Sequence, residues 1–245
     1  MSNNYWENQN NNLAYNNQST AETQAAGLAQ FFTQIYTWMT LGLAITGFLS
    51  VLVSSNEMLA TTLIRTPFLF FGLILVELGM VMAFTRSAAR GASFQTLAAM
   101  FIAYAALNGI TLSVVFMAYT AESVTQCFFV TAASFGALSV YGYVTKKDLS
   151  GLGRFLFMGV IGLIVASIVG MFWHSSALHM VISVVGVLIF AGLTAYDTQA
   201  LKTLYFQSQN DTAALGRLSL QGALKLYLDF INLMLYLLRF MGRRK

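Results

Sequence analysis

The segment "LKLYLDFINLMLYLLRF" spans residues 224–240 and is apolar enough to lie in a membrane, yet it contains Lys225, Asp229 and Arg239. An ionised group in hydrocarbon costs roughly 3 kcal/mol or more, so such residues need a partner, water or a functional role. Polar residues recur here at intervals of three and four and therefore share one helical face. This polar face consists of Gln221, Lys225, Asp229, Asn232, Tyr236 and Arg239.

The composition of the whole chain places this segment in a membrane protein. Charged residues make up 9% of the chain and hydrophobic residues 57%, whereas soluble domains carry roughly 25% charged residues. Apolar runs recur about every 25–30 residues without strand-like alternation, which predicts an all-α polytopic membrane protein and not a membrane barrel. We expect seven membrane helices, at residues 30–54, 67–86, 93–119, 124–144, 154–173, 178–200 and 221–241.

The N-terminal segment differs in composition from the rest of the chain. It reads "NNYWENQNNNLAYNNQ" at residues 3–18 and is mostly Asn and Gln. Such a segment buries too little apolar surface to offset its ordering entropy. We therefore expect residues 1–25 to be a disordered cytoplasmic tail and residues 26–245 to form the transmembrane domain.

The distribution of basic residues predicts the orientation. The loops after the second, fourth and sixth predicted helices carry seven Lys or Arg residues: Arg86, Arg90, Lys146, Lys147, Arg154, Lys202 and Arg217. The intervening loops carry only Arg65. Basic residues concentrate in cytoplasmic loops, so we expect a cytoplasmic N-terminus. The closing "GRRK" conflicts with this rule if the last helix crosses fully, and a re-entrant last helix is the alternative.

Two aspartates on consecutive predicted helices are expected to meet. Asp197 lies in "GLTAYDTQALK" (192–202), roughly 5–8 Å inside the cytoplasmic end, and Asp229 lies roughly 12 Å inside from the same end. Two adjacent buried carboxylates disfavour double ionisation, so the pair can hold one proton, or lose it and bind a cation such as Ca²⁺ through oxygen ligands. We expect Asp197 and Asp229 to be the proton- and cation-sensing residues, with no other metal site and no cofactor.

Further polar residues accompany the predicted pair. Arg86 lies level with Asp197 at the cytoplasmic end and can compete for the carboxylates, so protonation would release it and open a gate. Glu77 lies roughly 13 Å deeper, and Asn108 belongs to a milder polar face with Tyr104 and Thr111. The plainer alternative is that Lys225 and Asp229, one turn apart, pair only with each other. That alternative leaves Asp197 and Glu77 unexplained.

Several segments resemble the signature blocks of the transmembrane Bax inhibitor motif family. These segments are "VELGMVMAF" (76–84), "LNGITLS" (107–113), "YGYVTKKDLSGLG" (141–153), "GLTAYDTQALK" (192–202) and "ALKLYLDFINLMLYLLRFMG" (223–242). The resemblance covers about residues 30–243. It is strongest to bacterial members, which are multi-pass inner-membrane proteins.

The resemblance implies a fold and an activity. The fold is a seven-helix bundle with the C-terminal helix central, and the activity is a pH-sensitive calcium leak. Asp197 and Asp229 match the family's aspartate pair, Glu77 matches the acidic residue of the second helix, and Arg86 matches its arginine latch. The distance from Glu77 to Arg86 is about one residue shorter than the pattern, so Arg90 is a second candidate.

Other functions were weighed against the leak. An intramembrane aspartyl protease would need Gly-x-Gly-Asp and Pro-Ala-Leu motifs, which this chain lacks, and a retinal pump would need the reverse order of Lys225 and Asp229. We therefore expect no enzyme activity and no nucleic-acid partner, because no exposed basic face with aromatic residues is visible. A regulator that binds membrane proteases or other membrane proteins without transport remains the alternative.

Overall fold

The computed structural model describes the backbone of residues 3–173 and 175–245, and the side chains of residues 22–245 apart from positions 64, 171 and 174. The described chain is helical apart from turns and one isolated bridge, which confirms the all-α class. Its helices are α1 (Asn3–Ser55), α2 (Glu57–Arg65), α3 (Pro67–Ala89), α4 (Phe94–Ala118), α5 (Ala121–Val144), α6 (Ser150–Phe172), α7 (Ser176–Ser208) and α8 (Thr212–Met241).

Local sequence signals explain where several helices begin. Side-chain oxygens of Ser93 and Asp211 accept hydrogen bonds from the first turns of α4 and α8, at 3.2 and 2.9 Å. Such caps satisfy backbone donors that have no partner inside the helix. Pro67 opens α3, where its missing N–H costs nothing. The short helix α2, capped by Asn56, was not predicted.

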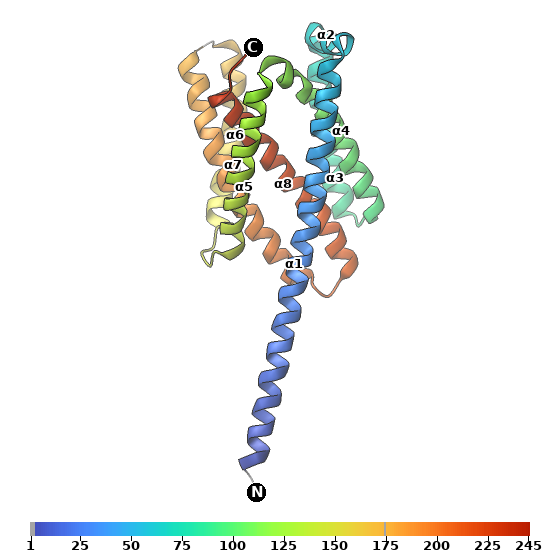
Figure 1. Ribbon diagram of the computed structural model, residues 1–245, viewed down its shortest axis with the longest axis vertical. Coiled ribbons are helices and arrows are strands. Elements are labelled where there is room, and N and C mark those ends of the chain that lie inside the picture. Colours follow the sequence, from blue (N-terminus) through green and yellow to red (C-terminus); the bar gives the residue numbers. More distant parts are fainter. Residues whose placement is uncertain (1–2, 174) are drawn as a thin grey trace.

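The helix α1 begins at Asn3 and therefore includes most of the segment expected to be disordered. Figure 1 shows its N-terminal part extending alone beyond the other helices. Residues 1–2 lie outside the described residues, as do the side chains before residue 22. The expected disorder of residues 1–25 therefore stays a prediction.

The helices that surround α8 form two groups. In one group α1, α3 and α4 pack together with α2, and in the other α5 and α6 pack against α7. Direct contact between the groups is limited and joins α1 to α7 and, through the rings of Phe32 and Tyr143, to α5, whereas α8 contacts members of both groups. In Figure 1 α8 runs diagonally between them, from the lower right to the upper left. The C-terminal helix is thus the main connection between the two groups.

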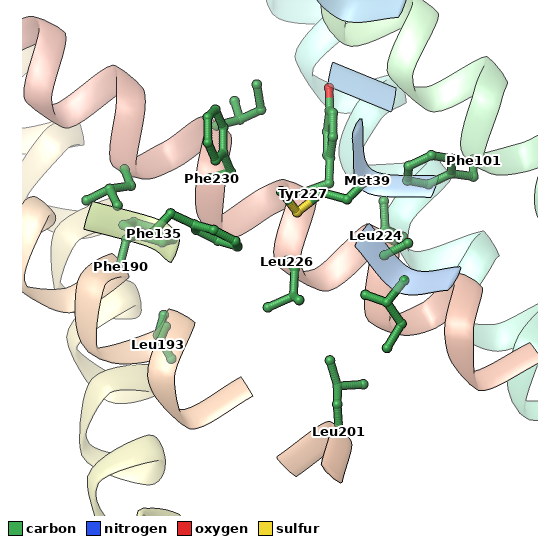
Figure 2. Close-up of a cluster of buried hydrophobic side chains, with 14 of the residues drawn as sticks. Met39, Phe101, Phe135, Phe190, Leu193, Leu201, Leu224, Leu226, Tyr227 and Phe230 are labelled. Atoms are coloured by element: carbon green, nitrogen blue, oxygen red, sulfur yellow. The ribbon is translucent and has the colours of Figure 1, made fainter. Parts of the chain in front are cut away.

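The buried face of α8 explains why it can hold both groups. Tyr227 has no exposed surface, and its ring packs edge-on against Phe101 of α4, with 5.9 Å between centroids. One turn away, Phe230 packs against Phe135 of α5 at 5.5 Å. Figure 2 shows Tyr227 near Phe101 and Phe230 near Phe135, on different sides of α8. Leu226 and Leu233 of the same helix are also almost completely buried.

Six of the described helices are long and apolar enough to cross a membrane, and α8 is not among them. They are Glu22–Ser55 of α1, Pro67–Ala89, Phe94–Ala118, Ala121–Val144, Ser150–Gly170 of α6 and Ser176–Ser208. The loops after α3, α5 and α7, which carry most of the basic loop residues, lie at the lower end of the bundle in Figure 1. The chain is thus a multi-span membrane protein, and α8 packs against several of the candidate spans.

The C-terminus lies at the upper end of the bundle, opposite the start of α8 (Figure 1). There the tail pairs with the turn between α4 and α5: the N–H of Thr120 donates to the carbonyl of Arg243 at 3.1 Å, and Tyr119 bridges to Arg244. The guanidinium of Arg244 also lies 5.8 Å from the centre of the Tyr119 ring. The helix α8 therefore runs through the bundle without turning back, unlike the re-entrant alternative.

Candidate functional site

The acidic centre of the molecule lies where α7 packs against α8. Asp197 of α7 and Asp229 of α8 are 2% and 5% exposed, and their carboxyl groups face each other closely enough to interact. The Nζ of Lys225, one turn before Asp229, lies 2.6 Å from Oδ1 of Asp197. The structure therefore brings together the two predicted aspartates and places a lysine beside them.

The two facing carboxyl groups set the charge of this centre. A carboxylate has no hydrogen to donate, so the two groups can bond to each other only when one of them carries a proton. The ion pair with Lys225 favours the carboxylate form of Asp197, which leaves Asp229 as the group to carry such a proton. The centre then holds one negative and one positive charge. Oδ2 of Asp229 is buried and has no hydrogen-bond partner among the described residues.

Lys225 is paired differently from the simple sequence expectation. Its ion-pair partner is Asp197 on α7, not Asp229 on its own helix. Half of its side chain is exposed, and its Nζ lies 5.4 Å from the centre of the Tyr196 ring. The plainer reading, in which Lys225 and Asp229 pair only with each other, is thus wrong, because α7 supplies the nearer oxygen.

A second polar cluster lies between α3, α4, α8 and α1. Thr111 donates to Oε1 of Glu77 at 2.6 Å, and the amide of Asn108 donates to Oε2 at 3.4 Å. Oδ1 of Asn108 accepts from the hydroxyl of Tyr227 at 3.0 Å, and that hydroxyl is 2.7 Å from Oγ1 of Thr46. Glu77 is therefore held by protein donors, and the cluster ties α8 to the group of α1, α3 and α4.

Both clusters border one large cavity of about 1240 Å³. Its walls come from α3, α4, α6, α7 and α8 and are mostly apolar. Its polar lining includes Glu77 and Asn108 on one side, and Asp197, Lys225 and Asp229 on the other. The acidic centre thus faces a space large enough for water and ions, within a bundle of membrane helices.

The predicted latch does not contact the acidic centre in this conformation. Arg86 and Arg90 have exposed side chains, and neither takes part in a salt bridge within the described part of the chain. Lys225 occupies the cationic position beside Asp197 instead. Asn232 lines the cavity and donates to the carbonyl of Leu228 at 2.8 Å. The role of Arg86 as a latch stays a prediction.

The two aspartates alone would not complete the shell of a cation such as Ca²⁺. Among the described residues, no group of three or more His, Cys, Asp or Glu side chains is arranged to hold a metal ion. Ca²⁺ prefers six to eight oxygen ligands, and Asp197 and Asp229 supply at most four. Water in the cavity would have to supply the remaining ligands.

Two polar contacts at the site were not predicted from the sequence. In the sequence Tyr227 lies among apolar residues of the last helix. A buried tyrosine usually needs a hydrogen-bond partner for its hydroxyl, and this requirement is the signal that could have indicated the contact. His179 lies in the first turns of α7 and contacts the guanidinium of Arg239 on α8. The polar face of α8 therefore has partners along its length.

The chain is similar to known proteins over most of its length. A family model described as "Inhibitor of apoptosis-promoting Bax1" matches residues 28–245. The inner membrane protein YbhL of Escherichia coli K12 is 44% identical over 226 residues, covering 90% of this chain and 94% of the relative. A membrane protein of Streptococcus pyogenes is 41% identical over 219 residues, covering 89% and 94%. A protein of Caulobacter vibrioides is 45% identical over 226 residues, covering 89% and 90%.

Proposed function

Because the chain belongs to the Bax inhibitor family of membrane proteins, we propose that it is a pH-sensitive leak for Ca²⁺ and related cations in the bacterial inner membrane. The observation that carries the proposal is the buried pair of facing carboxyl groups of Asp197 and Asp229, beside Lys225 and at the edge of a large cavity. Such a pair exchanges a proton for a cation with few other changes.

The charge balance of the centre supplies the pH dependence. With the shared proton present, Asp197, Asp229 and Lys225 together are neutral. Loss of that proton leaves two carboxylates facing one ammonium group, and the centre gains one net negative charge. A negative charge in a low-dielectric cavity attracts a cation and repels the neighbouring carboxylate. Acid pH restores the proton and expels the cation.

The arrangement of the helices supports a gate in the same place. The acidic centre joins α8 to α7, and the Glu77 cluster joins α8 to α3 and α4. A change of charge at the first contact loosens one attachment of α8 while the other stays closed. The predicted latch extends this idea, since Arg86 would reach the carboxylates only after such a movement.

The proposal includes the orientation of the chain. The N-terminus and the loops after α3, α5 and α7 are cytoplasmic, and α8 crosses as a seventh span at the centre of the bundle. In a Cys127→Ser background, cysteines placed at Asn210 and Lys245 mark the two ends of α8. A membrane-impermeant maleimide applied to spheroplasts should label position 245 and not position 210, and equal labelling of both would refute the seventh span.

The central test is Ca²⁺ flux into liposomes that contain the purified protein and an indicator dye. Measured between pH 5 and pH 8, the wild-type flux should change with pH because the two carboxyl groups titrate as a coupled pair, and Asp197→Asn or Asp229→Asn should flatten that profile. Asp148→Asn is the matched control. Hydrogen bonds from Ser150 lower the pKa of the exposed Asp148 carboxyl, so it stays ionised throughout and its replacement should leave the profile unchanged.

The outcomes of this assay separate the two candidate functions. An unchanged pH profile in both aspartate variants would remove the acidic centre from the mechanism. Absence of flux from the wild-type protein at every pH would favour a regulator that binds membrane proteases or other membrane proteins. The proposal treats the chain as a non-enzyme, and a model transmembrane peptide added to the same liposomes should remain uncleaved.

A further inference from the structure

The large cavity has a feature that ion passage does not use: long apolar walls on α3 and α6. We propose that the cleft between α3 and α6 binds one acyl chain of an anionic phospholipid from the surrounding bilayer, with its phosphate beside Arg154. This inference is independent of the proposed leak, because it concerns the membrane-facing side of the cavity and a different ligand.

The cleft lies on the path to the bilayer. In Figure 1 α3 and α6 lie on opposite sides of α8, and they share no extensive packing within the described part of the chain. Both are candidate membrane spans, so lipid tails surround their outer faces. Within the described part of the chain no residue of α1, α2 or α5 lines the cavity, so we infer that a lipid tail enters it from the side that α3 and α6 flank.

The walls of the cleft match an acyl chain. Leu78 and Met82 of α3 and Phe157 and Ile164 of α6 line the cavity, and each is more than half exposed. Apolar side chains with this exposure offer contacts that no protein group uses. The cavity of about 1240 Å³ exceeds the roughly 300–1,000 Å³ of typical ligand pockets, so one lipid tail fits.

The charged residues of the cleft place the headgroup. Arg154 lies in the second turn of α6, at the lower end of the bundle, and lines the cavity. The neighbouring Gly153 leaves no room for a Cβ because the ring of Tyr196 lies against it, and Lys225 lies over the same ring. Two cationic side chains therefore approach the cavity from the end where basic loop residues gather and where lipid phosphates would lie.

The acids of the cavity do not cancel this attraction. Glu77 accepts hydrogen bonds from Thr111 and Asn108, while Asp197 and Asp229 face each other and Asp197 pairs with Lys225. Arg154 is the cationic lining residue without a salt bridge in the described part of the chain. Asp148 is an acidic neighbour of Arg154, but it lies outside the cavity and is exposed. Arg154 thus remains available to a phosphate.

The experiment uses photo-crosslinking in nanodiscs of phosphatidylcholine that contain a small share of a probe lipid. The probe carries a diazirine on its acyl chain and either a phosphatidylglycerol or a phosphatidylcholine headgroup. Mass spectrometry of the labelled peptides should place most of the phosphatidylglycerol label on α3 and α6. Arg154→Gln should reduce the ratio of phosphatidylglycerol to phosphatidylcholine labelling about fivefold, as expected for one basic residue near anionic lipid.

A matched pair of variants tests the acyl-chain site itself. Ile164 lines the cavity and Ile161 does not, although both are on α6 and are 56% and 53% exposed. Ile164→Trp should fill the cleft and lower the labelling by both probes at α3 and α6, whereas Ile161→Trp should leave it unchanged. Leu78→Trp, on the opposite wall, should repeat the effect of Ile164→Trp.

The same measurements can overturn the proposal. Equal labelling of wild-type protein by the two probes would show ordinary contact with bulk lipid only. Equal labelling of the Ile164→Trp and Ile161→Trp variants would show that no tail enters the cleft. All variants replace exposed residues, and an unfolding midpoint in detergent equal to that of the wild-type protein verifies that each is folded.

Discussion

Replacing Tyr227 by Phe removes one oxygen from the centre of the bundle and tests the attachment of α8 to α1 and α4. The hydroxyl is 3.0 Å from Oδ1 of Asn108 and 2.7 Å from Oγ1 of Thr46. Thr46 also lies 2.8 Å from the carbonyl oxygen of Ala105, to which it can donate. In the variant Thr46 keeps that acceptor, whereas Oδ1 of Asn108, in a side chain only 7% exposed, loses its donor.

The size of the effect follows from this loss. A buried acceptor left without a donor costs about 1–3 kcal/mol, and hydrogen bonds between membrane helices contribute about 0.6 kcal/mol on average and 1.7 at most. We therefore expect Tyr227→Phe to lower the free energy of unfolding by about 1–2 kcal/mol. The ring contact with Phe101 is unchanged, so no packing loss adds to this figure.

Tyr104→Phe is the matched control for this prediction. Tyr104 is 6% exposed and packs edge-on against the Tyr227 ring at 5.9 Å, but its hydroxyl makes no hydrogen bond in the described part of the chain. Reversible unfolding by sodium dodecyl sulfate in mixed micelles measures both variants. Equal losses for Tyr227→Phe and Tyr104→Phe would refute the reasoning, because the hydroxyl contacts would then carry no stability.

Three further substitutions test other parts of the structure, two by the same unfolding assay and one by amide hydrogen exchange. Lys225→Met leaves the buried Asp197 without its cation. It should lower the free energy of unfolding by about 2 kcal/mol, less than the loss of a fully buried ion pair, because the lysine is half exposed. Adding Asp197→Asn should recover most of this loss, and no recovery would argue against the ion pair. Gly109→Ala would put a Cβ 2.8 Å from a backbone oxygen of α1 and should cost about 1–3 kcal/mol, whereas Gly72→Ala, which meets no atom within 4 Å, should be neutral. Asn56→Ala removes the cap of α2 and should cost that helix about 1 kcal/mol, seen as faster amide exchange confined to residues 57–65.

The helices were predictable because each apolar run is long and has clear ends. Each of the seven expected segments overlaps a described helix, with only residues 93, 119 and 173 beyond the helix ends, and the helices are longer mainly where polar turns continue them, as in the last residues of α7. The helix α2 was missed because nine residues between two spans carry little apolar signal. Asn56 before Glu57, and Arg65 in the last turn, are the cap and charge pattern that would have indicated it.

The sequence predicted the depth of the two aspartates in the membrane, but not which neighbouring side chains they face. The rise per residue placed Asp197 and Asp229 near one another, and packing of α7 on α8 brings their carboxyl groups into contact. The rotation of each helix about its axis is set by tertiary packing, which a single sequence does not encode in a readable way. For this reason Lys225 and not Arg86 lies beside Asp197. Likewise, Gly159 and Gly170 of α6 face side chains of α7, whereas Gly162 faces open space.

The position of α8 has a consequence for how the protein is made. Synthesis proceeds from the N-terminus, so the two helix groups reach the membrane before the segment that joins them. Until the 30 residues of α8 leave the ribosome, the faces that later enclose Tyr227 and Phe230 have no occupant. Biogenesis therefore depends on its last step, and chains shortened at the C-terminus should be degraded as two loosely associated halves.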